Sequence, residues 1–180
     1  MSRMLAQSFF NRPTLEVAED LLGMFLVRRI GSREISFPIT EVEAYDGFDD
    51  AASHASRGMT ARNAPMFGEA GFWYVYLVYG MHWMLNIVTG PKEYPAAVLI
   101  RGAGEWDGPG KLGKALSINK TFNNKPANRV AGLWIEDRGV RIKKSDTKRL
   151  PRVGVEYAGP VWLKKPYRLR YIGNFATLQE

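Results

Sequence analysis

The sequence predicts a mixed α/β (α+β) fold: a single domain with a predominantly antiparallel, curved sheet, flanking helices and a protruding β-hairpin. The chain has 180 residues, of which 46% are hydrophobic, which suits one domain with a substantial core. Short runs with strand-like alternation are more frequent than stretches with helical periodicity. Strands and helices also do not alternate regularly, as they do in parallel sheets. We therefore expect one domain over residues 1–180.

The first expected element is a helix between Pro13 and Gly23. Proline suits a first helical turn, and glycine suits the position just past a helix end. Apolar residues recur three to four positions apart, so they share one face: Leu15, Ala18, Leu21 and Leu22. A strand over residues 25–29 and a turn at Gly31 should follow.

A second strand, over residues 35–45, contains an anomaly. Its alternate positions are first apolar and then acidic or phenolic: Ile35, Phe37, Ile39, Glu41, Glu43 and Tyr45. One explanation is a β-bulge that swaps the faces, so that Val42 and Ala44 point inward. The other is that the carboxylates lie at the edge of the buried face, where burial would raise their pKa values.

The next segment is aromatic and predicts a β-hairpin. Its β propensity is high because of Phe72, Trp73, Tyr74, Tyr76 and Tyr79. The pair Tyr79-Gly80 interrupts the strand pattern, which resumes over residues 83–89. Tyr79 is therefore expected near the tip of the hairpin.

The remaining elements are short. Further strands are expected over residues 96–101, 133–136, 140–143 and 167–172, and a short helix over residues 109–118. The polar segments 123–129 and 145–152 are expected to be surface loops.

Charge is distributed unevenly along the chain. The net charge is +7, but residues 1–90 sum to −3 and residues 91–180 sum to +10. A basic half indicates a polyanion-binding face, although a merely solvated surface would have the same composition. No apolar run approaches the roughly 20 residues that span a bilayer, and the first residues do not resemble a secretion signal. We expect an intracellular protein without a membrane partner.

Most kinds of catalytic site are disfavoured by the residue types present. The absence of cysteine excludes disulfides, zinc–thiolate sites and cysteine nucleophiles. The only histidines, His54 and His82, do not have metalloprotease spacing, so no metal or other cofactor is expected. The segment 108–112 fails the P-loop pattern twice, and no GxSxG motif is present. What remains is a pair of carboxylates followed by aromatic residues, a combination that suits base recognition and water activation.

Several long motifs resemble one known family, the alkyladenine DNA glycosylases, also called 3-methyladenine DNA glycosylases. They cover nearly the whole chain in order: ITEVEAY (39–45), ASHASRGMTARNAPMFG (52–68), YVYLVYGMHWMLNIVT (74–89), PAAVLIR (95–101), GPGKLGKALSINKTF (108–122) and RVGVEYAGPVWLKKPYRLRY (152–171). The resemblance implies an enzyme of base excision repair. Its substrate would be double-stranded DNA containing damaged purines.

The resemblance also implies a role for particular residues. Glu43, in the Glu-Ala-Tyr triplet, matches the general base that activates water. Tyr45, His54 and Tyr76 match the residues that line the pocket and contact the flipped base. Tyr79 matches the tyrosine that enters the minor groove and fills the vacated place in the stack. Periodicity alone does not choose between Glu43 and its neighbour Glu41.

Two further pocket residues follow from the resemblance, and three DNA contacts follow from charge. Asn86 matches a residue whose bulk is thought to exclude the 2-amino group of guanine, and Arg101 matches an arginine near the pocket. Lys111, Lys114 and Lys120 are candidate contacts to the DNA backbone.

The residues also bear on the type of reaction. No lysine precedes position 92, and all expected pocket residues except Arg101 lie in that stretch. A Schiff-base lyase needs an amine nucleophile, so a monofunctional glycosylase that leaves an abasic site is expected. The resemblance implies that the substrates are 3-methyladenine, 7-methylguanine, hypoxanthine and ethenoadenine.

Two other functions remain open. The same aromatic and basic surface would suit a nucleic-acid-binding protein without catalysis, and a glycosidase of free nucleosides would use the same carboxylate. A monomer is the simplest assembly for scanning DNA. The protein would act in the cytoplasm or nucleoid of a prokaryote, or in a eukaryotic nucleus.

Overall fold

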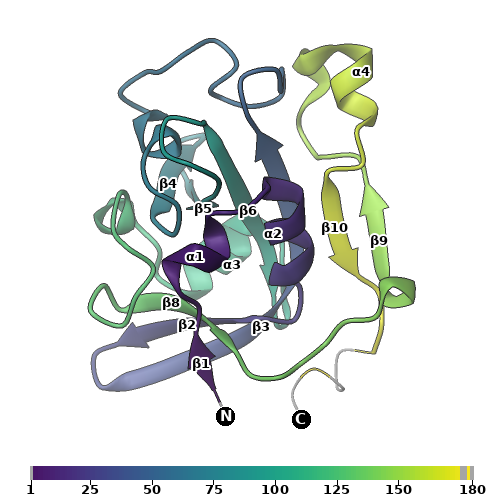
Figure 1. Ribbon diagram of the computed structural model, residues 1–180. Coiled ribbons are helices and arrows are strands. Elements are labelled where there is room, and N and C mark those ends of the chain that lie inside the picture. Colours follow the sequence, from purple (N-terminus) through teal and green to yellow (C-terminus); the bar gives the residue numbers. More distant parts are fainter. Residues whose placement is uncertain (1, 175–177, 179–180) are drawn as a thin grey trace.

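The computed structural model describes residues 2–174 and Leu178, and its strands form one open, ten-stranded sheet (Figure 1). The strands are β1 (Arg3–Met4), β2 (Phe25–Ile30), β3 (Arg33–Asp46), β4 (Trp73–Val78), β5 (His82–Val88), β6 (Ala96–Ala103), β7 (Trp106–Asp107), β8 (Leu133–Asp137), β9 (Thr147–Leu150) and β10 (Arg168–Tyr171). The α-helices are α1 (Gln7–Phe10), α2 (Thr14–Leu21), α3 (Pro109–Ala115) and α4 (Gly159–Lys164). Short 3-10 helices are η1 (Ala64–Phe67), η2 (Lys120–Phe122), η3 (Lys144–Asp146) and η4 (Glu156–Ala158).

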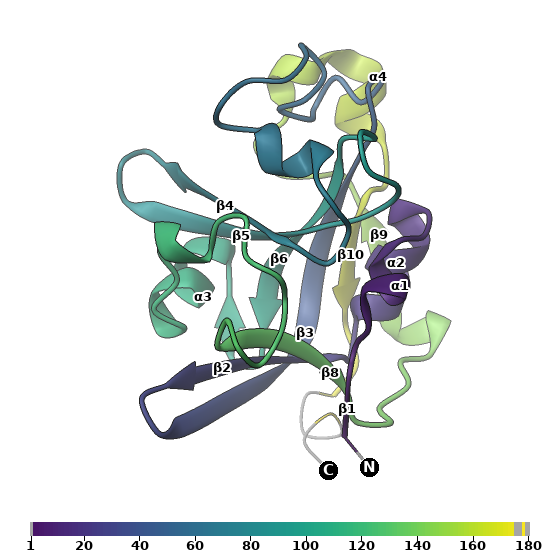
Figure 2. The same cartoon turned by 60° about the vertical axis from the view of Figure 1, so that its left-hand side comes forward.

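The sheet is antiparallel at each strand pairing of the described residues, which confirms the predicted fold class. Its main path runs β1-β8-β2-β3-β6-β5-β4, while β10 pairs with β3 and β9, and β7 pairs with β6. The long strand β3 lies in the middle of this path and pairs with β2, β6 and β10. Figure 2 shows the β4–β5 hairpin projecting from the body of the molecule, as expected from the sequence.

One face of the sheet forms the main hydrophobic core. Adjacent strands contribute fully buried side chains that pair across the sheet: Val42 and Ala44 of β3, Val98 and Ile100 of β6, and Ile87 of β5. Helices α2 and α3 add apolar residues to the same core: Val17, Ala18, Leu21, Leu112 and Leu116. Because strand side chains alternate, the residues between these positions lie on the opposite face.

The anomaly in β3 is explained by a bulge. The register with β6 shifts on both sides of Glu41, so Ile39 and Val42 both reach the core although they are an odd number of residues apart. Glu41 and Glu43 are nevertheless buried, at 3% and 0% exposure, on the opposite face. The bulge offered by the sequence is therefore confirmed, and the alternative, in which the carboxylates lie at the edge of the core face, is wrong about the face although both carboxylates are buried.

Helix α2 and its C-terminal glycine are found where the sequence predicts them. Pro13 precedes the first helical residue, and Gly23 has a φ of 83°, in the region that glycine adopts without strain. The Gly23 N–H donates to the carbonyl oxygen of Ile39 at 2.9 Å. This hydrogen bond connects the end of the helix to β3.

Two predictions for the C-terminal third are wrong. Residues 140–143 form no strand; Val140 and Ile142 are apolar because they pack on buried residues without pairing. Residues 145–152 contain β9, which pairs with β10. This edge strand is polar because its central residues are exposed, so its sequence resembles a loop.

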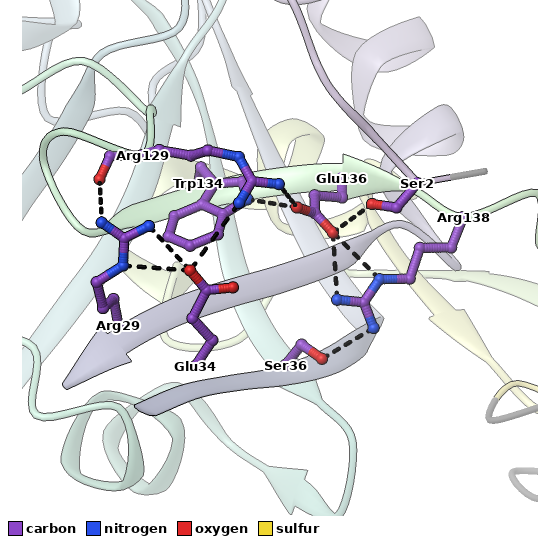
Figure 3. A network of polar contacts seen from close by, with 8 residues as sticks. All are labelled: Ser2, Arg29, Glu34, Ser36, Arg129, Trp134, Glu136 and Arg138. Atoms are coloured by element: carbon purple, nitrogen blue, oxygen red, sulfur yellow. Dashed lines mark hydrogen bonds and ion pairs between the residues drawn. The ribbon is translucent and has the colours of Figure 1, made fainter. Parts of the chain in front are cut away.

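A polar network holds the other end of the sheet together (Figure 3). Trp134 is fully buried, lies under the Arg129 guanidinium at 4.8 Å, and donates from Nε1 to Glu136 at 2.7 Å. Ser2 and Arg138 donate to the other oxygen of Glu136, at 2.6 and 3.2 Å. The eight residues labelled in Figure 3 connect β2, β3 and β8 with the start of the chain, and none of them lines the cavity described below.

The helices of the described residues are short. None is long and apolar enough to cross a membrane.

Candidate active site

The face of the sheet opposite the core borders a cavity of about 1000 Å³. Strand alternation places side chains from four neighbouring strands on it: Glu43 and Tyr45 of β3, Tyr74 and Tyr76 of β4, Met84 and Asn86 of β5, and Ala97, Leu99 and Arg101 of β6. His54 and Arg62 from the loop after β3, and residues 153–155 and Tyr157 from the C-terminal segment, complete the lining. All seven expected catalytic, pocket and intercalating residues therefore border one cavity.

Glu43 lies fully buried in the lining, with donors on both carboxylate oxygens. The Val153 N–H donates to Oε1 at 2.8 Å, and the Tyr45 hydroxyl donates to Oε2 at 2.9 Å. Arg101 Nη1 lies 3.3 Å from Oε1. Burial raises the pKa of Glu43 above its ordinary value, and the positive charge of Arg101 and the two hydrogen bonds oppose that rise. The site thus holds a carboxylate with raised proton affinity and compensates its charge.

Glu41 has a different environment, although it is two residues away. Its oxygens contact three arginines: Arg101 and Arg168, each at 3.1 Å, and Arg170 at 3.6 Å. It is not part of the cavity lining. Within the described part of the chain, no group of three or more metal-ligating side chains surrounds these carboxylates or any other point. Glu41 therefore binds arginines, and of these two glutamates only Glu43 borders the cavity.

Aromatic rings gather beside Glu43. The rings of Tyr74 and Tyr76 lie 5.0 Å apart at 32°, and His54 meets Tyr76 edge-on at 4.8 Å. His54 Nδ1 and the Tyr74 hydroxyl are 3.2 Å apart. Burial raises the pKa of Tyr76 to about 12, so its hydroxyl stays protonated at neutral pH. Desolvation and the charge of Arg62 lower the pKa of His54, which favours the neutral imidazole. The lining can therefore stack on a flat ring and offer neutral polar groups.

Asn86 is held in one orientation at the base of the hairpin. It is 3% exposed and pairs directly with Tyr74 across the two strands. Its amide nitrogen donates to the Tyr74 carbonyl oxygen at 3.0 Å. This bond leaves Oδ1 as an acceptor for which no described residue acts as donor.

Tyr79 is at the tip of the β4–β5 hairpin and is 87% exposed. Tyr79 and Gly80 both have positive φ, at 52° and 67°, and the Met81 N–H closes the turn onto the Val78 carbonyl oxygen at 3.1 Å. Two positive φ values are typical of the tight turns that match the twist of a hairpin. A large aromatic residue in this region is uncommon and points to function.

The three candidate DNA-contacting lysines lie around α3. Lys111 borders the cavity, whereas Lys114 and Lys120 are exposed and do not. The helix approaches the hairpin closely at two glycines: a Cβ on Gly110 would lie 2.9 Å from His82 Nδ1, and one on Gly113 would lie 2.6 Å from the Trp83 carbonyl oxygen. This close packing fixes Lys111 and Lys114, which lie on α3, relative to the hairpin.

Sequence reasoning missed several groups around Glu43. Val153 acts through its backbone N–H, which leaves no trace in a side-chain pattern. Arg62 and Tyr157 lie in motifs that resemble those of the glycosylases, but the sequence assigned neither residue a role. The buried ion pair of Arg152 with Asp50 joins segments about 100 residues apart, and its only sequence signal was the motif containing Arg152.

Comparison with known proteins agrees with the motifs. The family model described as methylpurine-DNA glycosylase matches residues 8–105 and 104–174. A protein of Methanocella arvoryzae is 45% identical, covering 91% of this chain and 90% of its own; one of Myxococcus xanthus is 42% identical, covering 92% and 88%. Both are provisionally named 3-methyladenine DNA glycosylase. The chain belongs to the methylpurine-DNA glycosylase family.

Proposed function

We propose that this protein flips a damaged purine out of duplex DNA and hydrolyses its N-glycosidic bond with water activated by Glu43, leaving an abasic site. Its family consists of DNA glycosylases, which are hydrolases acting on N-glycosyl bonds. One observation supports the mechanism above all: the buried Glu43 carboxylate borders an aromatic cavity whose rim includes the exposed Tyr79. Damaged bases inside a stack are inaccessible, so the reaction requires such a pocket outside the helix.

The chemistry assigned to Glu43 follows from its surroundings. An ionised carboxylate can orient water toward C1′ and accept its proton while positive charge develops on the sugar. The positive charge of Arg101 opposes the rise in the pKa of Glu43 that burial causes, and so favours the ionised form. The bond from C1′ to the base nitrogen breaks, and the electron pair leaves with the base.

The cavity suits a range of flat purine lesions. Stacking on an aromatic ring contributes about 1–3 kcal/mol per base and tolerates different bases. A cationic base such as 3-methyladenine or 7-methylguanine leaves readily. Neutral hypoxanthine or ethenoadenine needs hydrogen bonds from the pocket. His54, Tyr76 and Asn86 are the polar groups that we propose contact the base, with Tyr45 supporting Glu43.

A panel of duplexes, each with one defined lesion, tests the proposed function directly. We expect base release from at least one alkylated or deaminated purine, leaving an abasic site, and no release from undamaged duplex. The corresponding free nucleosides should react far more slowly. Binding to every lesion duplex without release would show a non-catalytic nucleic-acid-binding protein. Equal, salt-independent activity on nucleosides would show a nucleosidase.

Tyr79 is proposed to enter the minor groove and occupy the space vacated by the flipped base. Its exposure, its position at a hairpin tip and its constrained φ present a flat ring to the DNA. The projecting hairpin gives this ring reach beyond the body of the protein (Figure 2).

Replacing Tyr79 with alanine should therefore reduce the flipped population. Losing about 1–3 kcal/mol of stacking predicts a fall of roughly 5- to 150-fold in single-turnover base release. The fall should shrink when the damaged base faces a mismatch, because that base costs less to extrude. A Met81→Ala variant, altered at a neighbouring exposed residue, is the matched control. Equal rates for Tyr79→Ala and wild type on paired lesions would contradict the wedge role.

Lys111, Lys114 and Lys120 are proposed to contact DNA phosphates near the hairpin, with the protein bound as a monomer to intracellular DNA. Each lost phosphate contact should reduce the slope of log affinity against log salt by about 0.9. We expect Lys111→Ala, Lys114→Ala and Lys120→Ala each to show this loss in fluorescence anisotropy with lesion duplexes. Lys148→Ala on β9, which does not border the cavity, should keep the wild-type slope. Unchanged slopes for all three α3-region lysines would contradict the proposed contacts.

The proposed reaction is monofunctional, but the cavity includes one lysine that requires a test. Lys111 borders the rim and is exposed, whereas Glu43 is fully buried. Borohydride reduction during turnover should trap no covalent protein–DNA adduct, and the abasic strand should remain uncut. A trapped adduct that disappears in Lys111→Ala would show a lyase and overturn this expectation.

A further inference from the structure

A second buried ion pair lies beside Glu43 without a part in the proposed chemistry. The side chains of Arg152 and Asp50 are both fully buried. Their two hydrogen bonds run from Nη1 to Oδ2 at 2.5 Å and from Nη2 to Oδ1 at 2.7 Å. This bidentate arrangement sets both the position and the plane of the guanidinium. It joins the loop after β3 to the segment that precedes η4.

The same guanidinium touches β3 next to Glu43. Arg152 Nη1 also donates to the carbonyl oxygen of Ala44 at 2.8 Å. Its Cζ lies 4.7 Å from the centre of the Tyr45 ring, a cation–π distance. These contacts restrain the two residues that donate to Glu43. Tyr45 donates to Oε2, and Val153, the residue after Arg152, donates to Oε1.

Asp50 extends this restraint to the loop that borders the cavity. Its Oδ2 accepts the Asp46 N–H and its Oδ1 accepts the Ala52 N–H, each at 3.1 Å. The Tyr157 hydroxyl donates to the Ala52 carbonyl oxygen at 2.8 Å, which ties η4 to the same loop. Arg152 Nε is buried with no partner among the described residues, an energetic cost that stability alone would not favour.

We propose that Arg152 is a positioning residue for Glu43: clamped by Asp50, it holds the Val153 N–H and the Tyr45 hydroxyl against the two oxygens of that carboxylate. The inference rests on the proposed function, because it assumes that Glu43 activates the water. Arg152 itself does not line the cavity, so it acts through its neighbours.

The consequence is a specific pH dependence. The charged and titratable groups around Glu43 come from three strands and the C-terminal segment. They are Arg101 on β6, Tyr45 and the indirectly linked Glu41 on β3, Tyr76 on β4, and Arg152 and Tyr157 in the C-terminal segment. The hydrogen bonds from Val153 and Tyr45 both lower the pKa of Glu43. Loosening them raises that pKa, so the acid limb of the rate profile should move to higher pH.

The decisive experiment replaces the pair without leaving an unpaired buried charge. In the double variant Asp50→Asn with Arg152→Met, the net charge of the pair stays zero and no buried charge is left unpaired. Because the charge of Arg152 itself lowers the pKa of Glu43, Arg152→Lys, which keeps that charge, is measured beside it to separate lost positioning from lost charge. Single-turnover base release from a lesion duplex is measured across the acidic and neutral range. We expect at least a tenfold slower rate near the wild-type limb, since a pKa rise of one unit gives about tenfold. Affinity for the lesion duplex should stay close to that of wild type.

The matched control applies the same chemical changes remote from the cavity: Glu136→Gln with Arg138→Met, in the network of Figure 3. This control should lose thermal stability but keep the wild-type acid limb. A folded Asp50/Arg152 double variant with the wild-type limb would overturn the inference, whether or not its rate falls. If that variant does not fold, Arg152→Lys tests the inference instead. It keeps the charge but loses the bidentate clamp, so the acid limb of its rate profile should still move to higher pH.

Failure of this inference is distinguishable from failure of the proposed function. If Glu43→Gln releases base normally, the proposed mechanism fails. If Glu43→Gln is inactive and both Arg152 variants retain the wild-type profile, only the positioning role is refuted.

Discussion

Glu43→Gln should abolish base release while leaving binding to lesion DNA nearly unchanged. The amide cannot accept the proton of the attacking water, and general-base catalysis typically contributes about 10²- to 10⁴-fold. The fold should tolerate the change, because the Gln oxygen can still accept the Val153 N–H and its amide nitrogen can donate to the Tyr45 hydroxyl. Single-turnover base release and fluorescence anisotropy on the same lesion duplex separate the two effects. We expect a rate loss of at least about 100-fold with little change in Kd.

The matched comparison is Glu41→Gln, on the same strand two residues earlier. Glu41 is equally buried but faces three arginines and does not border the cavity. Its amide variant should lose much less activity, mainly through looser placement of Arg101. Normal base release by Glu43→Gln, or a larger loss from Glu41→Gln, would refute the assignment of Glu43 as the base.

Arg101→Met should produce the second large loss in the rate of base release. Unlike the loss in Glu43→Gln, this loss should depend on pH. Arg101 lies between the two buried carboxylates, 3.1 Å from Glu41 and 3.3 Å from Glu43. Its charge lowers the pKa of Glu43, so removing it favours the protonated, inactive form. Each unit of pKa rise costs about tenfold in rate at a pH below the new pKa. The rate should therefore fall about 10- to 100-fold at neutral pH and recover partly as the pH rises.

A full rate profile against pH checks this prediction. Arg168→Met is the control, because Arg168 also contacts Glu41 at 3.1 Å but makes no ion pair with Glu43. Its acid limb should move less than that of Arg101→Met. A uniform rate loss for Arg101→Met, without recovery at high pH, would mean that Arg101 acts on the substrate rather than on the ionisation of Glu43.

The elements that follow from the sequence are those with strong local patterns. The helix after Pro13 has the periodicity that burial on one face imposes, and the aromatic hairpin has a high β propensity. The strand over residues 96–101 is a continuous apolar run, because both of its faces are buried. The exposed edge strand β9 has no such pattern, because its central residues face solvent. Residues 140–143 alternate like a strand, yet they pack without pairing. A local sequence pattern indicates which residues are buried. It does not indicate which strand will be the hydrogen-bonding partner of the segment.

The same division applies to the candidate site. The sequence by itself determined the family, through several long motifs in order. Periodicity left Glu41 and Glu43 equivalent as the candidate acid, and the resemblance selected Glu43. Only the tertiary structure showed why these carboxylates differ: a bulge in β3 turns both away from the core, three arginines occupy Glu41, and Glu43 borders the cavity. The Val153 N–H that donates to Glu43, and the Arg152 side chain that pairs with Asp50, both come from a segment about 100 residues further along the chain. Such contacts depend on chain folding, so no pattern of neighbouring residues encodes them.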